Sequence, residues 1–318
     1  MPDLSPQRRP NPTIAPPPEP EFTGSLFETL ASTGIGFPVE RDVITAIGAD
    51  AATYLQGQLS QDVESMAEGD SAWSLLLQPQ GKLAALVLVT RMSATSFALA
   101  TEPGAGADAL ARLLRFKLRV DCELTLATRH GIALRGVGAS SFVANGSTNR
   151  AELLVARFRW AGIDGVDVLG AESSSVPELP DGVPDVGADG AEYFRIAVGF
   201  PRAGVELDEK TNSGRGPASS RCRRRLRKVA TSAKSSLLGS TPVATTHAAH
   251  LVRMAADAPV GADEQLHLDG ETVGYLTSVV ANPDGGVLAL GYLMRKAGDA
   301  ELFIAAESVV PVRLLGTV

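Results

Sequence analysis

The sequence has few cysteines, few aromatic residues and no long apolar run. Its two cysteines, Cys122 and Cys222, form neither a disulfide framework nor a CxxC metal-binding pair, which fits a reducing compartment. The longest apolar run, Leu83 to Val89, is far too short to cross a bilayer. The N-terminus opens with Pro, Arg and Glu instead of a basic stub and an apolar stretch, so no secretory signal is expected. These absences predict a soluble cytoplasmic protein without a membrane partner.

Conventional catalytic motifs are absent as well. The sequence contains no HExxH, no GxSxG and no Walker motif. Of its four histidines, His130 and His267 stand alone, and only His247 and His250 are close in sequence. We therefore predict no metal site and assign no catalytic residue. Whether the protein is an enzyme stays open, and a binding protein is the favoured interpretation.

One segment differs in charge from the rest of the chain. The formal net charge of −7 argues against nucleic acid as a partner of the whole surface. Asn212 to Ala249, however, holds eight of the 29 basic residues, and no acidic residue occurs between Lys210 and Ala256. The composition of residues 212–249 therefore differs from that of the rest of the chain.

Composition divides the chain into four parts. Residues 1–23 are rich in proline and predict a disordered tail. Residues 24–211 alternate between strand and helix patterns and form a body, with a Pro-, Gly-, Ser- and Asp-rich linker at 170–190. After the basic segment 212–249, residues 250–318 contain short strands between Asp-Gly turns. This spacing predicts a small antiparallel barrel, and the fold class is α+β.

Apolar periodicity locates the elements of the body. The strands expected there are Val43–Ile47, Trp73–Leu77, Leu83–Thr90, Ser96–Ala100, Val120–Ala127, Gly131–Arg135, Ala151–Phe158 and Val166–Leu169. The helices expected there are Ala49–Leu59, Ala107–Phe116 and Glu192–Val198.

Three longer stretches carry a resemblance. The first is 48–63 (GADAATYLQGQLSQDV) followed by 75–82 (LLLQPQGK). The second is 194–211 (FRIAVGFPRAGVELDEKT), and the third joins 274–278 (GYLTS) to 288–293 (LALGYL). In this order and at these intervals they resemble the folate-binding superfamily of glycine-cleavage aminomethyltransferase (GcvT) and the YgfZ-type proteins. The resemblance runs from Phe27 to Leu315, apart from the basic segment.

The resemblance implies a fold, a cofactor and a function. It implies a multidomain ring with tetrahydrofolate in a central funnel and, for the YgfZ branch, a role in the assembly or repair of iron–sulfur proteins, with a link to tRNA modification. Folate and iron–sulfur client proteins are the partners it implies. A folate-dependent aminomethyltransferase, or a related one-carbon enzyme, is the alternative. A structural RNA-binding module is a third interpretation, and the overall acidity argues against it.

The resemblance also points to site residues. We expect Arg195 and an acidic residue among Glu206, Asp208 and Glu209 to bind the folate. A carboxylate that faces the donor nitrogens of a pterin can accept charge-assisted hydrogen bonds from them. Ala85 helps to distinguish the aminomethyltransferases from the YgfZ-type proteins. The aminomethyltransferases carry an aspartate at the aligned position, and this aspartate matters for their catalysis. A methyl group cannot accept a proton, so Ala85 disfavours the transferase.

The basic segment lacks a signature of the YgfZ branch, Lys-Gly-Cys-Tyr-x-Gly-Gln-Glu. Suitable codons for Lys228 to Pro242, read in a neighbouring frame, encode Gly-Cys-Tyr-Val-Gly-Gln-Glu, so a frameshift is the favoured explanation. A disordered insert and an evolved basic loop for RNA phosphates are the alternatives. The reactive cysteine of the family would fall across Val229 and Ala230, neither of which has a thiol. The function is therefore expected to be impaired in this chain.

Overall fold

Two antiparallel sheets form the framework of the protein. The computed structural model describes residues 25–79, 83–137, 139, 153–171, 177–207, 249–294, 297, 302–305 and 309–317. The first sheet has seven strands in the order β2-β3-β4-β1-β5-β7-β6, and the second is a closed barrel in the order β10-β11-β8-β13-β12-β9. The predicted fold class, α+β with a C-terminal antiparallel barrel, is confirmed.

The first sheet contains the body strands. They are β1 Ile35–Ile47, β2 Ser71–Leu77, β3 Leu83–Ser93, β4 Ser96–Thr101, β5 Glu123–Arg135, β6 Leu154–Trp160 and β7 Ile163–Leu169. β1 and β5 pair over thirteen residues, from Ile35 opposite Arg135 to Ile47 opposite Glu123. The sequence predicted only the end of β1 and split β5 in two. The middle of β1 is partly exposed, so the apolar alternation that reveals a strand is lost there while the ladder continues.

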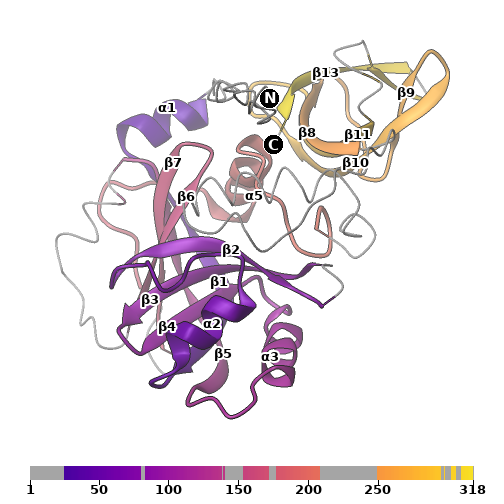
Figure 1. The fold of residues 1–318 in the computed structure, drawn as a ribbon. Coiled ribbons are helices and arrows are strands. Elements are labelled where there is room, and N and C mark those ends of the chain that lie inside the picture. The colour runs from indigo at the N-terminus through magenta and orange to yellow at the C-terminus, as the bar shows by residue number, and fades with distance from the viewer. Residues whose placement is uncertain are drawn as a thin grey trace, which may run out of the picture.

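Helices cover both faces of this sheet. α2 Ala51–Gln58 and α3 Gly106–Arg115 pack on one face, where Leu55 and Leu113 are fully buried. α5 Gly187–Ala197 lies against the other face, as Figure 1 shows. α1 Ser25–Ser32, which precedes β1, was not predicted from the sequence.

α5 lies between the sheet and the barrel (Figure 1). Phe194 and Val198, four residues apart, pack into the core of the sheet. Tyr193 and Ile196, on another side of the helix, pack against Leu290 of the barrel. Since the two sides of one short helix are buried in two different cores, α5 fixes the barrel to the body.

The barrel consists of six strands, and a tight turn joins β9 to β10. Its strands are β8 Ala249–Ala256, β9 Gln265–Leu268, β10 Glu271–Ala281, β11 Val287–Met294, β12 Leu302–Ala305 and β13 Val309–Thr317. Asp269 and Gly270 both have positive φ, 51° and 81°, and connect β9 to β10. A two-residue Asp-Gly turn of this kind matches the twist of a hairpin, which is why the sequence revealed it.

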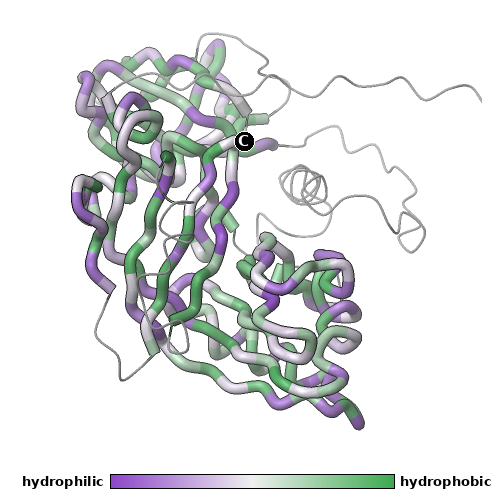
Figure 2. The backbone as a smooth tube through the Cα atoms, turned by 90° about the vertical axis from the view of Figure 1, so that its left-hand side faces the viewer, coloured by the Kyte–Doolittle hydropathy of each residue, from purple (hydrophilic) through white to green (hydrophobic). Residues whose placement is uncertain are grey.

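Apolar residues recur along the strands of both units in Figure 2, with polar residues between them. Among the residues that the structure describes, no helix has the length and apolarity to cross a membrane. The predicted tail 1–23 lies outside the described residues, as does nearly all of the basic segment 212–249. The predicted linker 170–190 includes the first turn of α5, which begins at Gly187.

Candidate functional site

A glycine ends α5 and turns the chain toward the barrel. Gly199 has a φ of 70°, a conformation that residues with a Cβ rarely adopt. The N–H of Phe200 reaches back to the carbonyl of Arg195 at 2.8 Å, and this bond closes the helix end. Phe200 then enters the core of the sheet, and residues 201–207 run on toward the barrel.

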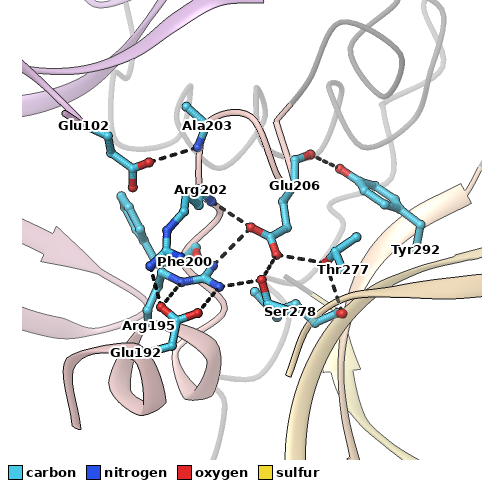
Figure 3. A network of polar contacts seen from close by, with 11 residues as sticks. Glu102, Glu192, Arg195, Phe200, Arg202, Ala203, Glu206, Thr277, Ser278 and Tyr292 are labelled. Atoms are coloured by element: carbon cyan, nitrogen blue, oxygen red, sulfur yellow. Dashed lines mark hydrogen bonds and ion pairs between the residues drawn. The ribbon is translucent and has the colours of Figure 1, made fainter. Parts of the chain in front are cut away.

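A network of buried and half-buried polar side chains lies where this loop meets the barrel (Figure 3). We call it the seam network, and its members are Glu192, Arg195, Arg202, Glu206, Thr277, Ser278 and Tyr292. Two of the three stretches that carried the family resemblance, 194–211 and 274–293, meet here in space.

Arg195 is at the centre of the seam network. Its Nη1 donates to Glu206 Oε2 at 3.1 Å and to the carbonyl of Phe200 at 2.9 Å. Its Nη2 donates to Glu192 Oε1 at 2.7 Å and to Ser278 Oγ at 2.6 Å, and its Nε donates to the other oxygen of Glu192. The guanidinium thus connects α5, the loop and the barrel, and it is almost fully buried.

Glu206 is fully buried and surrounded by protein donors. One carboxylate oxygen accepts from the N–H of Arg202 at 2.9 Å, and the other accepts from the hydroxyls of Thr277 and Ser278. Its carbonyl accepts from the hydroxyl of Tyr292. These bonds tie the loop to two strands of the barrel.

A bulge in β10 makes the double hydroxyl contact possible. Adjacent residues of a regular strand point to opposite faces. The pairing of β10 with β11 shifts between Leu276 and Ser278, which leaves Thr277 as the extra residue. Such a bulge re-aims side chains, so Thr277 and Ser278 both reach the carboxylate of Glu206.

The charges of the network stabilise one another. Burial would raise the pKa of Glu192, but the hydrogen bonds and charge of Arg195 and the charge of Arg202 hold that pKa below its usual value. Burial would also lower the pKa of Arg195, and Glu192 together with Glu206 raises it instead. Both groups therefore remain charged, as a buried ion pair requires.

Glu102 approaches the loop from the body. It follows the last residue of β4, and its Oε2 accepts from the N–H of Ala203 at 3.2 Å (Figure 3). Burial raises the pKa of Glu102, while Arg41 and Arg202 oppose that rise. Sequence reasoning missed this residue, because nothing in the sequence connects position 102 to position 203.

An aromatic cluster lies beside the loop in the core of the sheet. The ring of Phe200 is 4.9 Å from that of Trp73 and 5.0 Å from that of Trp160, between centroids. Phe158 is 5.8 Å from the same ring. The indole N–H groups of Trp73 and Trp160 are buried and have no hydrogen-bond partner among the described residues. Two unpaired donors in an aromatic setting suit a planar ligand that carries acceptors.

The predicted site residues are placed as follows. Arg195 and Glu206 lie together in the seam network, where each is engaged by protein groups. Asp208 and Glu209 lie outside the described residues, although they directly follow the end of the loop at Leu207. Among the described residues no cluster of His, Cys, Asp and Glu could hold a metal ion.

Ala85 and Cys122 are both in the core. The side chain of Ala85 is 2% exposed and packs in the core on the face of the sheet that α2 and α3 cover. Cys122 is buried too, and burial raises the pKa of its thiol, which disfavours the reactive thiolate. Cys222 lies outside the described residues.

Comparison with solved structures identifies the architecture. The crystal structure of glycine cleavage system aminomethyltransferase T from Bartonella henselae superposes with a TM-score of 0.69 and 18% sequence identity. The superposition covers 91% of this chain and 87% of that one. The chain has the aminomethyltransferase T fold.

Sequence comparison also finds an aminomethyltransferase, but the match covers less of the chain. The Aminomethyltransferase of Chlorobium chlorochromatii (strain CaD3) is 21% identical over 193 residues, which are 52% of this chain and 53% of that relative. The chain thus matches about half the length of this curated relative. No protein-family model matches it. The comparisons give the aminomethyltransferase T fold, and the YgfZ branch and the frameshift stay predictions.

Proposed function

We propose that this protein is a cytoplasmic folate-binding accessory protein that supports the assembly or repair of iron–sulfur proteins and is linked to tRNA modification. The observation that carries the accessory role is Ala85. By the resemblance it stands where transferases have a catalytic aspartate, and its methyl group packs beneath α2 and α3, on the face of the sheet opposite the aromatic cluster. From Leu83 to Ser93, β3 contains no carboxylate, so the strand offers no proton acceptor to replace it.

The residues present fit a reduced folate. A pterin is a planar ring with N–H donors along one edge and an oxygen acceptor beside them. The aromatic cluster contributes the two unpaired indole N–H groups, and its rings pack against one another in the core. Arg195 and Glu206 would act by positioning, since both are held by protein groups. Asp208 and Glu209, which follow the loop, remain proposed ligand contacts. When bound, tetrahydrofolate supplies a carrier for one-carbon units.

Calorimetry tests the proposal. A chain shown to be folded by circular dichroism is titrated with 5-formyltetrahydrofolate, a chemically stable reduced folate. We expect weak saturable binding with one site per chain. A folded chain that shows no saturable heat would overturn the folate assignment.

The second candidate is a folate-dependent aminomethyltransferase. Two observations favour it: the matched solved structure and the matched curated relative are both aminomethyltransferases. The assay is ammonia release from an aminomethylated carrier protein in the presence of tetrahydrofolate. We expect no release above background because of Ala85, and turnover at a rate comparable to that of an authentic transferase would establish this candidate instead.

The basic segment gives the accessory role its sharpest test. We propose that a frameshift removed the Lys-Gly-Cys-Tyr-x-Gly-Gln-Glu signature from the region around Lys228. The chain as it stands is then expected to fail in complementing a strain that lacks its YgfZ-type protein, and the frame-corrected chain is expected to succeed. A serine in place of the restored cysteine should impair it again. Full complementation by the unaltered chain would contradict this account, and resequencing of the gene across this region settles the cause.

A further inference from the structure

The segment that ends α3 carries exposed apolar side chains. Leu114, Phe116 and Leu118 are 48%, 38% and 78% exposed. They stand at alternate positions of the sequence, and Figure 1 shows α3 at the end of the body remote from the barrel. Single exposed apolar residues are normal on a protein surface, but a group of large ones marks a place where something binds. We call residues 112–119 the α3 tip.

Basic residues alternate with these apolar ones. Arg115, Lys117 and Arg119 each follow one of them, and Arg112 lies one helical turn before Phe116. The guanidinium of Arg112 is 4.2 Å from the centre of the Phe116 ring, and that of Arg115 is 5.8 Å from it. Both distances allow a cation–π attraction, which brings positive charge beside the exposed ring. The α3 tip is therefore apolar and positively charged at once.

The cations of the α3 tip lack carboxylate partners. Within the part of the chain that the structure describes, the side chains of Arg115, Lys117 and Arg119 form no ion pair and donate no hydrogen bond. Acidic residues outnumber basic ones in the sequence, 36 to 29, so the shortage of partners is local. These three charges are therefore available to an anionic group from outside the protein.

The backbone beside these cations also has free donors. The N–H groups of Leu118, Arg119 and Val120 donate no hydrogen bond among the described residues, and pairing resumes where the N–H of Asp121 donates to Asp50. Arg119 has a φ of 54°, in the left-handed region that residues with a Cβ seldom occupy. Strained backbone of this kind is concentrated at binding sites. Exposed N–H groups next to unpaired cations favour an anionic ligand.

The chemistry of the α3 tip discriminates between classes of partner. A symmetric contact with a second copy of this chain would bring like charges together, which is unfavourable. An anionic membrane would also meet Asp121 and Glu123, which are exposed carboxylates just after the tip. RNA phosphates would use the cations but not Leu114 or Leu118. A protein surface can supply carboxylates and apolar contacts together, at separate positions.

We propose that the α3 tip is a docking surface for a partner protein that presents an apolar centre flanked by carboxylates. Phe116 and Leu118 are the apolar anchors, and the neighbouring basic side chains make charge-assisted hydrogen bonds to the carboxylates of the partner. The surface lies on the body and uses none of the residues of the seam network, so this inference does not depend on the folate assignment.

The first test measures fluorescence anisotropy of a short labelled peptide in which leucine and glutamate alternate, titrated with the full chain. We expect saturable binding that weakens as the salt concentration rises, because salt screens exposed charges. In one control peptide lysine replaces every glutamate, and in another serine replaces every leucine. Absence of binding by the leucine–glutamate peptide overturns the inference, as does binding of either control peptide with equal affinity.

The second test locates the binding surface with two variants and a matched control. Leu118→Ser removes an anchor that is exposed in the free protein, and Lys117→Glu reverses one charge. Each should lower the affinity for the leucine–glutamate peptide at least about tenfold. Leu315→Ser is the control, because Leu315 is 39% exposed on β13 of the barrel, and it should leave the affinity unchanged. Circular dichroism establishes that each variant is folded. Equal affinities of Leu118→Ser, Lys117→Glu and the control overturn the inference.

The third test separates a protein partner from the other anionic classes. Vesicles of phosphatidylglycerol and phosphatidylcholine, and a single-stranded oligouridylate, replace the peptide in the same titrations. The basic segment 212–249 is the same in every variant, so a difference between variants reports on the α3 tip. We expect Lys117→Glu to lower peptide affinity more than it lowers the affinity for vesicles or oligonucleotide. A larger loss for either of those two ligands assigns the tip to that ligand and overturns the inference.

Discussion

Among the residues that the structure describes, two buried arginine–carboxylate sites differ in what they connect. The first lies inside the seven-stranded sheet, where Arg135 and Asp167 are 2.6 Å apart and Arg41 approaches the same carboxylate at 3.3 Å. The second is the seam network, where Arg195 lies between Glu192 and Glu206. The first joins strands of one sheet, whereas the second joins a helix, a loop and the barrel.

The number of counter-ions also separates the two sites. In the sheet, two arginines share the single carboxylate of Asp167, and the guanidinium of Arg135 lies 3.8 Å from the ring centre of Phe158. In the seam network, Arg195 has two carboxylates. Loss of one carboxylate should therefore leave an unpaired buried charge in the sheet but not in the seam. The Arg135–Asp167 site should therefore be sensitive to the loss of its carboxylate. The seam network should tolerate the loss of one of the two carboxylates that contact Arg195.

The largest effect is expected from Asp167→Asn. The substitution leaves Arg135, 2% exposed, with no carboxylate partner, and removal of one member of a buried pair costs about 3–5 kcal/mol. Urea unfolding monitored by circular dichroism measures the change in the free energy of unfolding. Asp164→Asn is the control, because its pair with Arg159 is exposed on both sides and is worth at most about 1 kcal/mol. Equal effects of the two substitutions would show that burial does not decide the strength of these pairs.

A smaller effect is expected from Glu206→Gln. Arg195 retains Glu192, and the amide oxygen still accepts from one neighbour, so the loss should be about 1.5–3 kcal/mol, as for hydrogen bonds to a charged group. Because the broken bonds lead to Thr277 and Ser278 of the barrel, amide hydrogen exchange should accelerate in β10 more than in β5. Equal acceleration of amide hydrogen exchange in β10 and β5 would mean that the seam network does not stabilise the barrel more than the body.

Low pH should weaken the seam network, because Glu192 becomes protonated. Its folded-state pKa is lowered, so the stabilisation is fully present above the ordinary carboxyl pKa and is lost as the pH falls through the lowered value. Glu192→Gln should cost about 1.5 kcal/mol near neutral pH. The difference in the free energy of unfolding between this variant and the unaltered chain should shrink toward zero in acid. A difference that stays constant with pH would show that the charge of Glu192 contributes nothing.

The architecture could be predicted from the sequence because its signals are local. Turn residues such as Asp269 and Gly270 mark the hairpins of the barrel, and short continuous apolar runs mark β2 and β3. The exposed middle of β1 and the short α1 have no such signal, so pairing and packing rather than sequence pattern reveal them. Long-range ladders stabilise strands that alternation alone does not identify.

The candidate site could be predicted only in part. Arg195 and Glu206 were found because they lie in a stretch that resembles a known superfamily, and the structure brings them together with Thr277 and Ser278. Their burial and their protein partners could not be read from the sequence, since both depend on how the barrel docks. Glu102 was missed for the same reason, because its environment is created by a loop a hundred residues later in the chain.

The smallest effect is expected when a single tyrosine hydrogen bond is removed. The comparison is between a bond in the seam network and a bond inside the body. Tyr292 donates its hydroxyl to the carbonyl of Glu206 across the seam, and Tyr54 donates its hydroxyl to the carbonyl of Leu113 within the body at 2.6 Å. Burial raises the pKa of Tyr54 to about 12, so its hydroxyl stays a donor even at alkaline pH. Each tyrosine-to-phenylalanine substitution should cost about 1 kcal/mol, the usual net contribution of a neutral hydrogen bond.

The two substitutions should reduce protection from hydrogen exchange in different parts of the protein. Tyr54→Phe acts between α2 and α3 on one face of the sheet, so it should accelerate hydrogen exchange in the body and leave β10 and β11 protected. Tyr292→Phe removes a contact on the far side of α5, so it should loosen β10 and β11 first. If both variants loosen the barrel to the same extent, the body and the barrel unfold as one cooperative unit. The seam network would then be an internal part of a single domain, and the contrast with the Arg135 site would lie only in its counter-ions.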